Sequence, residues 1–131
     1  DALGDIDRQT IAGAISTGTH GTGILHQSIG ASVVAATLVT GDGRALRVSE
    51  EHRPELLPAV RLGLGALGVL VDVTLQCVPA FALEAVESAV ELDAVLGDWL
   101  GLLRRTDHFE FYWFAGTALA VDGSADGGAV R

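Results

Sequence analysis

The sequence predicts an α+β fold in which an antiparallel or mixed sheet is flanked by helices. Residues 32–40 (SVVAATLVT) are rich in β-branched side chains, which favour a strand. Gly41-Asp42-Gly43 is typical of a tight turn, and residues 44–48 return as the partner strand of a hairpin. The expected order is helix, loop, hairpin, helix, strand, strand, helix and strand. Because the hairpin pairs its strands antiparallel, it argues against a doubly wound parallel sheet.

The segments around the hairpin are predicted from caps, proline positions and apolar patterns. A helix of one or two turns is expected over residues 11–16, with Thr10 as a candidate N-cap. A second helix is expected over residues 54–64, where Pro54 suits the first turn. Residues 69–78 form a strongly apolar segment that predicts a third strand, ended by the proline that follows it.

The second half of the chain predicts two more strands, a helix and a tail. Residues 83–90 alternate as a strand, and residues 108–114 (HFEFYWF) form an aromatic strand. Residues 92–105 carry a helical stripe of apolar side chains. The Gly/Ala/Asp-rich tail, residues 115–131, is predicted to lack fixed structure. Cys77 lies in an apolar run and is predicted to be a buried small hydrophobe.

Length, composition and charge bound the function. The chain has 131 residues, enough for one domain or parts of two, and it begins at Asp1 without any methionine, so we expect a piece of a longer sequence. The balance of 8 basic against 17 acidic residues gives a net charge of -9, so no nucleic-acid partner is expected. The longest apolar stretch, residues 56–71, is interrupted by proline, arginine and glycine, so no transmembrane segment is expected. A cytoplasmic location follows, with peripheral membrane contact left open.

One motif matches a nucleotide-binding pattern only in its letters. Residues 63–68 (GLGALG) fit the GxGxxG pattern, which acts after a strand and at the start of a helix. Here a helix is predicted before the motif and a strand after it. The glycines are therefore expected to end the helix and turn the chain into the strand.

The stronger candidate for a binding site is the loop at residues 17–23 (TGTHGTG), which holds three glycines, three threonines and one histidine. Glycines allow positive φ and the close approach of a ligand, successive N–H groups can form an anion-binding nest, and threonine hydroxyls add donors. The alternative is an ordinary glycine-rich turn, but the small apolar residues 11–15 before the loop favour a site. His20 is either a donor near a cofactor or a histidine whose ring is satisfied by backbone.

Three segments resemble one family of flavoproteins. Residues 4–23 (GDIDRQTIAGAISTGTHGTG) resemble the FAD-binding domain of the vanillyl-alcohol-oxidase type, in the branch of the L-gulono- and D-arabinono-1,4-lactone oxidases and dehydrogenases, with alditol oxidases nearby. Residues 65–81 (GALGVLVDVTLQCVPAF) are similar to the strand that closes this domain, and residues 108–114 to a segment of the substrate domain. The resemblance covers residues 1 to about 114 and is expected to stop after Phe114, which would indicate an altered reading frame in the tail.

The resemblance implies FAD as the cofactor and an enzyme that oxidises a CH–OH group of a sugar-1,4-lactone or a polyol. A hydride would pass to flavin N5, and the electrons would leave to oxygen or another acceptor. Residues 1–80 would be the C-terminal part of a PCMH-type FAD-binding domain, residues 81–114 the start of the substrate domain, and residues 115–131 a disordered tail. An alditol oxidase and a non-catalytic ligand-binding or assembly module are the alternatives.

The resemblance also implies which residues lie at the cofactor, with the pyrophosphate and flavin along the loop. The implied backbone donors are the amides of Gly18, Thr19, Gly21 and Thr22. The implied cofactor-binding residues are Ala14, Ser16, Thr17, Gly18, Thr19, His20, Gly21, Thr22, Gly23 and Val69, the last through its main chain to adenine. The family's flavin-attachment histidine and its substrate-activating charged residues have no counterpart in this sequence. We therefore assign no catalytic residue, and expect weak FAD affinity and no turnover from this chain alone.

Overall fold

The computed structural model describes residues 2–4, 6–113 and 129–130. The chain divides into two compact units. Unit 1 comprises Asp1–Gly21 and His26–Pro79, and unit 2 comprises Thr22–Leu25 and Ala80–Arg131. The assignment of residues 1–80 and 81–114 to a cofactor domain and a substrate domain stays a prediction.

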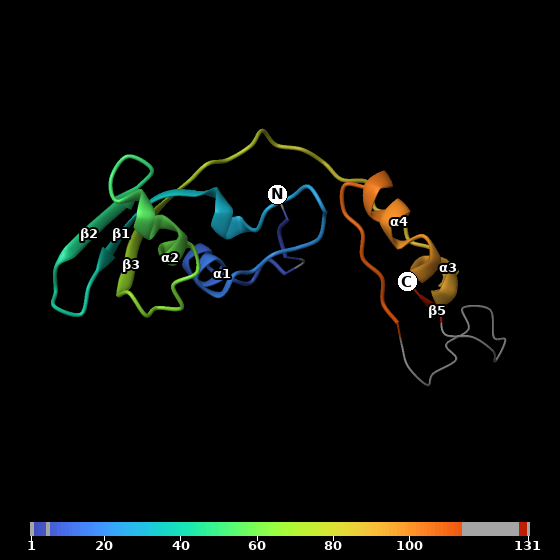
Figure 1. Ribbon diagram of the computed structural model, residues 1–131, viewed down its shortest axis with the longest axis horizontal. Coiled ribbons are helices and arrows are strands. Elements are labelled where there is room, and N and C mark those ends of the chain that lie inside the picture. Colours follow the sequence, from blue (N-terminus) through green and yellow to red (C-terminus); the bar gives the residue numbers. More distant parts are fainter. Residues whose placement is uncertain (1, 5, 114–128, 131) are drawn as a thin grey trace. The chain divides into compact units, whose positions relative to one another are not determined.

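Unit 1 is built on a three-stranded antiparallel sheet. β1 (Val33–Val39) lies in the middle, with β2 (Ala45–Ser49) on one side and β3 (Val69–Leu75) on the other (Figure 1). Within the predicted hairpin, the register places Leu38 opposite Leu46. The α+β class with antiparallel pairing is confirmed, because both neighbours of the central strand run against it.

The turn between β1 and β2 is fixed by local polar contacts. The Thr40 N–H donates to the Arg44 carbonyl at 2.9 Å, and Gly43 has a φ of 79°, which side chains with a Cβ disfavour. The Arg44 Nε lies 2.6 Å from Asp42 Oδ2, and the Thr40 hydroxyl donates to Asp42 Oδ1 at 2.5 Å. The Thr40 hydrogen bond holds the pKa of the Asp42 carboxyl below its ordinary value of 3.8.

The first helix forms where it was predicted. α1 (Ile11–Thr17) begins after Thr10, whose side chain accepts the Gly13 N–H at 3.1 Å, so the predicted N-cap is confirmed. A short 3-10 turn, η1 (Ile29–Ser32), leads directly into β1. Together these elements bring the N-terminal third of unit 1 against the sheet.

The second helix is shorter than predicted. The 3-10 turn η2 (Pro54–Leu56) is followed by α2 (Leu57–Arg61), so the helical region stops three residues before the predicted end at residue 64. Leu62 leaves the helical conformation with φ -146° and ψ 48°. The glycines that follow lower the helix propensity of this end, which explains the early stop.

The core of unit 1 lies between the sheet and the two helices. Ile15 of α1, Val33 of β1 and Val48 of β2 are its largest fully buried side chains. The buried cluster is Ile15, Val33, Ala36, Leu38, Val48, Leu57 and Val60. Burying a Val, Leu or Ile side chain contributes roughly 1.5–3 kcal/mol, so this cluster is what holds α1 and α2 against the strands.

The described residues of unit 2 form two short helices and a two-stranded ladder. Its elements are β4 (Val90–Glu91), α3 (Leu92–Gly97), α4 (Trp99–Arg105) and β5 (Ala129–Val130), with β4 and β5 antiparallel. The single helix predicted over residues 92–105 is divided at Asp98, which has φ -123° and ψ 27°. The Asp98 carboxylate accepts a hydrogen bond from Arg105 at 2.7 Å and its carbonyl accepts the Leu102 N–H at 3.0 Å, so it begins the second helix.

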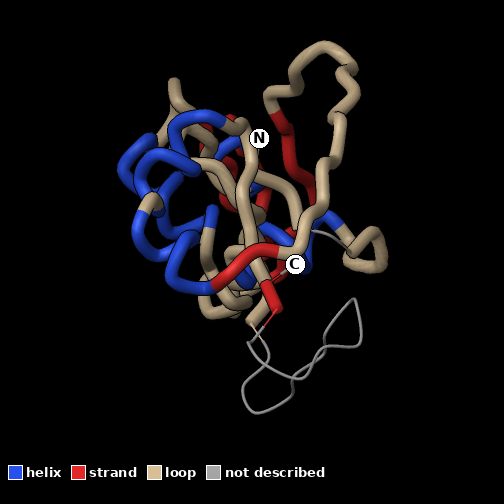
Figure 2. The backbone as a smooth tube through the Cα atoms, turned by 90° about the vertical axis from the view of Figure 1, so that its right-hand side faces the viewer, coloured by secondary structure: helices blue, strands red, loops and turns tan. Residues whose placement is uncertain are grey.

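Two strands predicted in unit 2 are wrong. Residues 83–89 form no strand, and β4 contains only the last residue of that prediction, Val90, followed by Glu91 (Figure 2). Residues 108–112 form no strand either, and Phe114 lies outside the described residues. Alternating side chains predict a strand only where a partner ladder exists, and neither segment has one among the described residues.

The aromatic residues of unit 2 pack on one another instead. The Trp99 ring lies 5.7 Å from the Phe109 ring and 5.5 Å from the Phe111 ring, at interplanar angles of 76° and 80°. These are edge-to-face contacts, which aromatic quadrupoles favour. The cluster joins α4 to the segment that follows it.

Three smaller predictions are also settled in part. Cys77 is exposed and not buried, because β3 ends at Leu75 and the thiol lies beyond the sheet. Of the tail at residues 115–131, the structure describes Ala129 and Val130, which form β5 instead of lacking structure; the other tail residues lie outside the description. No helix in the described ranges is long and apolar enough to span a membrane.

Candidate functional site

The loop at residues 17–23 begins as the C-terminal cap of α1. Gly18 adopts the left-handed conformation with φ 71°, and its N–H donates to the carbonyls of Ala14 and Ile15. The Thr19 N–H donates to the Ala14 carbonyl at 2.9 Å. The last carbonyls of a helix lack donors within the helix, and a glycine in this conformation supplies them. The amides of Gly18 and Thr19 are therefore used inside the chain.

The N-terminal residues fix the middle of the loop. Ala2 is only 4% exposed, accepts the Gly21 N–H at 3.0 Å and donates to the Gln27 carbonyl at 3.0 Å. A Cβ at Gly21 would collide with the Leu3 carbonyl oxygen. Glycine is required at this position because the backbone of residues 2–3 passes directly against it.

Three of the four amides predicted as cofactor donors are therefore already bonded. The N–H groups of Gly18, Thr19 and Gly21 donate to carbonyls of this chain, whereas the Thr22 N–H has no acceptor among the described residues. The prediction of a nest of free amides is wrong for the first three. The physical reason is that the loop follows the C-terminus of a helix, where carbonyls need donors, whereas anion sites form at helix N-termini.

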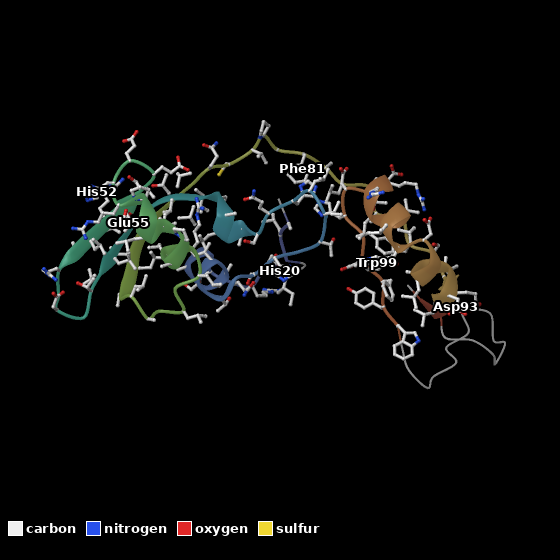
Figure 3. All side chains as sticks on the ribbon, in the orientation of Figure 1. His20, His52, Glu55, Phe81, Asp93 and Trp99 are labelled. Carbon is white, nitrogen blue, oxygen red and sulfur yellow. The ribbon has the colours of Figure 1, made fainter. Side chains whose placement is uncertain are left out.

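The side chains of the loop also bond locally. The Thr17 hydroxyl donates to a carbonyl one turn back in α1 at 3.0 Å, and the Thr19 hydroxyl donates to Gln9 Oε1 at 3.1 Å. The His20 Nδ1 lies 2.9 Å from the Gly21 carbonyl oxygen, and the ring is exposed (Figure 3). Of the two alternatives for this histidine, the backbone contact is the one observed.

The last two loop residues belong to unit 2. The Thr22 carbonyl oxygen lies 2.8 Å from the His108 Nδ1, and Gly23 has a φ of 116° that favours glycine. Both residues of this contact belong to unit 2. The assignment of Thr22 and Gly23 to a cofactor stays a prediction.

Unit 1 contains a cavity of about 540 Å³. α1 contributes Ala12 and Ser16, the β1–β2 turn contributes Thr40 and Gly41, and the start of β3 contributes Val69. Ser16 and Val69 are the two cofactor-site predictions that come from separate parts of the sequence. The structure brings them together at one cavity.

The glycine segment at residues 63–68 forms one wall of this cavity. α2 ends at Arg61 before the segment and β3 begins at Val69 after it, so the order is helix, glycines, strand. The dinucleotide-motif interpretation is excluded by this order, as predicted. Sequence reasoning nevertheless missed that the three glycines face a cavity. A signal was available in the sequence, since three glycines within residues 63–68 indicate a backbone with positive φ or a close approach. In the structure, Gly65 and Gly68 have φ values of 77° and 137°.

The remaining site predictions lie outside this cavity. Ala14 is 6% exposed and belongs to the interior, and the loop at residues 17–23 contributes nothing to the cavity lining. The lining residues are mostly apolar, with the hydroxyls of Ser16 and Thr40 as polar groups and no ionisable side chain among the described residues that form it. Such a surface suits a flat, largely apolar ring with a few polar edges better than a charged pyrophosphate.

Residues 73–126 match the family model of D-arabinono-1,4-lactone oxidase. The match continues past Phe114, so the expectation that the family likeness stops there, with an altered reading frame after it, is wrong. Most of residues 115–131 therefore resemble the family in sequence. The misjudgement came from composition, since small residues and glycine carry little pattern of their own.

Named relatives agree with this match. The chain is 41% identical over 115 residues to L-gulonolactone oxidase of Scyliorhinus torazame (88% of this chain, 26% of the relative) and 42% identical over 112 residues to that of Bos taurus (86% and 26%). It is 34% identical over 120 residues to D-arabinono-1,4-lactone oxidase of Candida glabrata (92% and 23%). The chain thus spans about a quarter of the length of the curated relatives it matches. Over most of its length, the chain is similar in sequence to sugar-1,4-lactone oxidases.

Proposed function

We propose that this chain is the part of an FAD-dependent sugar-1,4-lactone oxidase that holds the adenine end of the cofactor, and that the cavity of unit 1 is the adenine subsite. The observation that carries the proposal is the meeting of Ser16 and Val69 at one cavity. Both residues lie in segments that resemble the family's cofactor domain. The volume, about 540 Å³, lies within the usual range of small-molecule pockets.

The residues present fit the adenosine part of FAD. A purine is flat and mainly apolar with polar edges, and Val39 and Leu70 offer apolar surface while Ser16 and Thr40 offer hydroxyls. β3 lies at the edge of the described sheet, so the main chain at Val69 is open to a ligand on one side. When bound, FAD supplies the hydride acceptor for oxidation of a CH–OH group. The chain's own contribution is to bind and orient it.

We retain the loop at residues 17–23 as the proposed contact for the pyrophosphate and flavin, but by a different route. Threonine hydroxyls and an imidazole N–H can donate to phosphate oxygens. Thr17, Thr19 and His20 therefore replace the bonded amides as the proposed donors in unit 1. Their side chains are at or near the surface, where a ligand can compete with their local hydrogen bonds.

The proposed substrate of the whole protein is a sugar-1,4-lactone oxidised at a CH–OH group, with oxygen or another acceptor taking the electrons. L-gulonolactone and D-arabinono-1,4-lactone are the substrates named for the relatives. Because this chain spans about a quarter of those relatives, we expect it to bind the adenosine group without turnover. An alditol oxidase with the same cofactor is the nearest alternative, and the cytoplasmic location, with or without peripheral membrane contact, stays a prediction.

A non-catalytic binding or assembly module is the second candidate. The observation in its favour is that the amides of Gly18 and Thr19 cap α1 and the amide of Gly21 bonds to the Ala2 carbonyl. If the chain is such a module, its cavity is not expected to bind an adenine nucleotide. The two candidates are therefore separated by ligand binding alone.

The test is calorimetric titration of the purified chain with AMP, FAD and FMN. AMP and FAD share the adenosine group, so both are expected to bind with a Kd on the order of 0.1 mM, whereas FMN, which carries a phosphate but no adenine, binds much more weakly. Ala12→Trp should fill the cavity and abolish AMP binding. The matched control is Ile11→Trp, because Ile11 is 45% exposed and does not line the cavity. Equal binding of FMN and AMP, or no binding of either, would contradict the proposal, and the second result favours the module.

A further inference from the structure

We infer that Arg61 is a positioning residue for the cavity: it holds the wall formed by residues 62–68 at the separation from α1 that the adenosine group requires. The inference rests on the proposed function, since it concerns the same cavity. Arg61 does not line the cavity itself. It acts through the segment that follows it, at the end of α2.

The Arg61 side chain donates two hydrogen bonds to the first residue of β1. Its Nε and Nη2 donate to the Val33 carbonyl at 3.1 Å and 2.8 Å from a partly buried position. The β1–β3 register shifts between Val33 and Ala35, and such irregularities leave a ladder group without its partner. A guanidinium supplies donors there, and its charge makes each bond roughly twice as strong as a neutral one.

The main chain of Arg61 lies close against η1. A Cβ placed on Gly30 would lie 2.9 Å from the Arg61 carbonyl oxygen, so the backbone of η1 passes close to the end of α2. Gly30 is itself buried. The last residue of α2 is therefore bonded through its side chain and closely approached at its main chain before the cavity wall begins.

Two further contacts determine where the wall runs. The Leu64 N–H donates to the Ser16 carbonyl at 3.2 Å, and Gly68 lies so close to the Val39 carbonyl oxygen that a Cβ would collide with it. Ser16, Val39 and Gly68 all line the cavity, so these contacts set its width. Arg61 is the anchor at the N-terminal end of the wall.

The wall needs its anchors because it contains a strained residue. Leu64 has a φ of 49°, in the left-handed region that side chains with a Cβ disfavour, and its side chain is 71% exposed. Such a conformation persists only where the surroundings impose it. An exposed side chain makes few packing contacts that could impose this conformation. The hydrogen bond from Leu64 to Ser16 and the hydrogen bonds of Arg61 therefore hold Leu64 in it. Removing Arg61 should release the wall while leaving the core of the sheet in place.

The test is amide hydrogen exchange on the intact chain, comparing the original protein with Arg61→Met and Arg61→Lys. In Arg61→Met, the amides of Leu64 and Ala66 should exchange roughly tenfold faster, while the β1–β2 hairpin amides keep their rates. Arg61→Lys keeps the positive charge but loses the paired guanidinium donors. The exchange rates of its wall amides should therefore lie between those of the original protein and those of Arg61→Met. The Kd for AMP should rise roughly tenfold in Arg61→Met and less in Arg61→Lys.

Arg47→Met is the matched control, because Arg47 is exposed on β2 and its loss should change neither rate nor affinity. Unchanged wall amides in Arg61→Met would overturn the inference. Equal acceleration of wall and hairpin amides would overturn it too, since that pattern means a loss of global stability. Should Arg61→Met fail to fold, Arg61→Lys decides by the same comparison. If the original chain binds no AMP, the proposed function fails, and the exchange rates still decide whether Arg61 holds the wall.

Discussion

The two glycine-rich segments of unit 1, residues 17–23 and residues 63–68, look alike in sequence and differ in what lies beside them. Both follow a short helix, and in both some backbone N–H groups donate hydrogen bonds to carbonyls of the same chain. The backbone at Gly21 is pressed against Leu3, whereas a Cβ on Gly65 would meet nothing within 4 Å. A high density of glycines therefore indicates that another group can approach the backbone closely. Whether that group is a ligand or another part of the same chain depends on the residues that lie beside the segment.

The largest loss of stability is expected in the second segment, residues 63–68. Two substitutions there distinguish the cost of backbone strain from the cost of a steric collision. Gly68→Ala should destabilise unit 1 by about 3 kcal/mol, because the φ of 137° and the collision with the Val39 carbonyl act together. Gly65→Ala has a positive φ of 77° but open space, so it should cost only about 1 kcal/mol. The exchange of the slowest β1 amides reports both values. Equal losses would show that the contact at residue 68 contributes nothing.

Within the first segment, Gly21 should respond to packing alone. Gly21→Ala is expected to cost about 2 kcal/mol, because the new Cβ collides with the Leu3 carbonyl oxygen. The same change should leave AMP affinity unaltered, since residue 21 does not line the cavity. Gly41→Ala, with nothing within 4 Å of its Cβ, is the control for stability and should cost less than about 0.5 kcal/mol. A loss of AMP binding in folded Gly21→Ala would indicate that the ligand binds at the loop of residues 17–23 and not in the cavity.

A smaller effect tests the helix that leads into the first segment. Thr10→Ala removes the acceptor of the Gly13 N–H and should cost about 1 kcal/mol, whereas Thr10→Ser should retain most of the cap. Exchange of the α1 amides measures the difference. If both variants behave alike, the observed 3.1 Å hydrogen bond is not what starts α1.

The smallest effect concerns the turn between β1 and β2. The Thr40 hydrogen bond lowers the pKa of Asp42 below its ordinary value of 3.8 in the folded chain. A lowered folded pKa means that the ionised form stabilises the fold above the unfolded pKa, and that this contribution disappears as the pH falls through the folded pKa. Asp42→Asn should therefore flatten the pH dependence of stability below about pH 4, measured by urea unfolding across that window, and lower the stability slightly at pH 7, where the ionised carboxylate contributes. An unchanged acid limb would contradict the assignment.

Local features of unit 1 could be predicted from the sequence. The hairpin around residues 41–43 and the cap at Thr10 depend on neighbours within a few residues, so composition and spacing suffice to find them. The family was also recognisable, because residues 4–23 and 65–81 carry specific patterns.

Features that depend on distant partners could not be predicted. Residues 83–89 alternate as a strand should, but alternation does not reveal whether a partner strand exists. The Gly21 amide donates to the Ala2 carbonyl, and Ser16 and Val69 line the same cavity, and no local sequence pattern encodes either arrangement. One local signal was overlooked: a glycine directly after α1 indicates a helix C-cap, which uses the amides that an anion would need.

The most direct test of the central claim is backbone amide NMR of the intact chain titrated with AMP. If the cavity is the adenine subsite, the amides of Ser16, Thr40 and Val69 should shift together with saturation. The amides of Gly18, Thr19 and Gly21 should stay where they are, because their hydrogen bonds remain intact. Shifts confined to residues 17–23, with the cavity residues silent, would contradict the account.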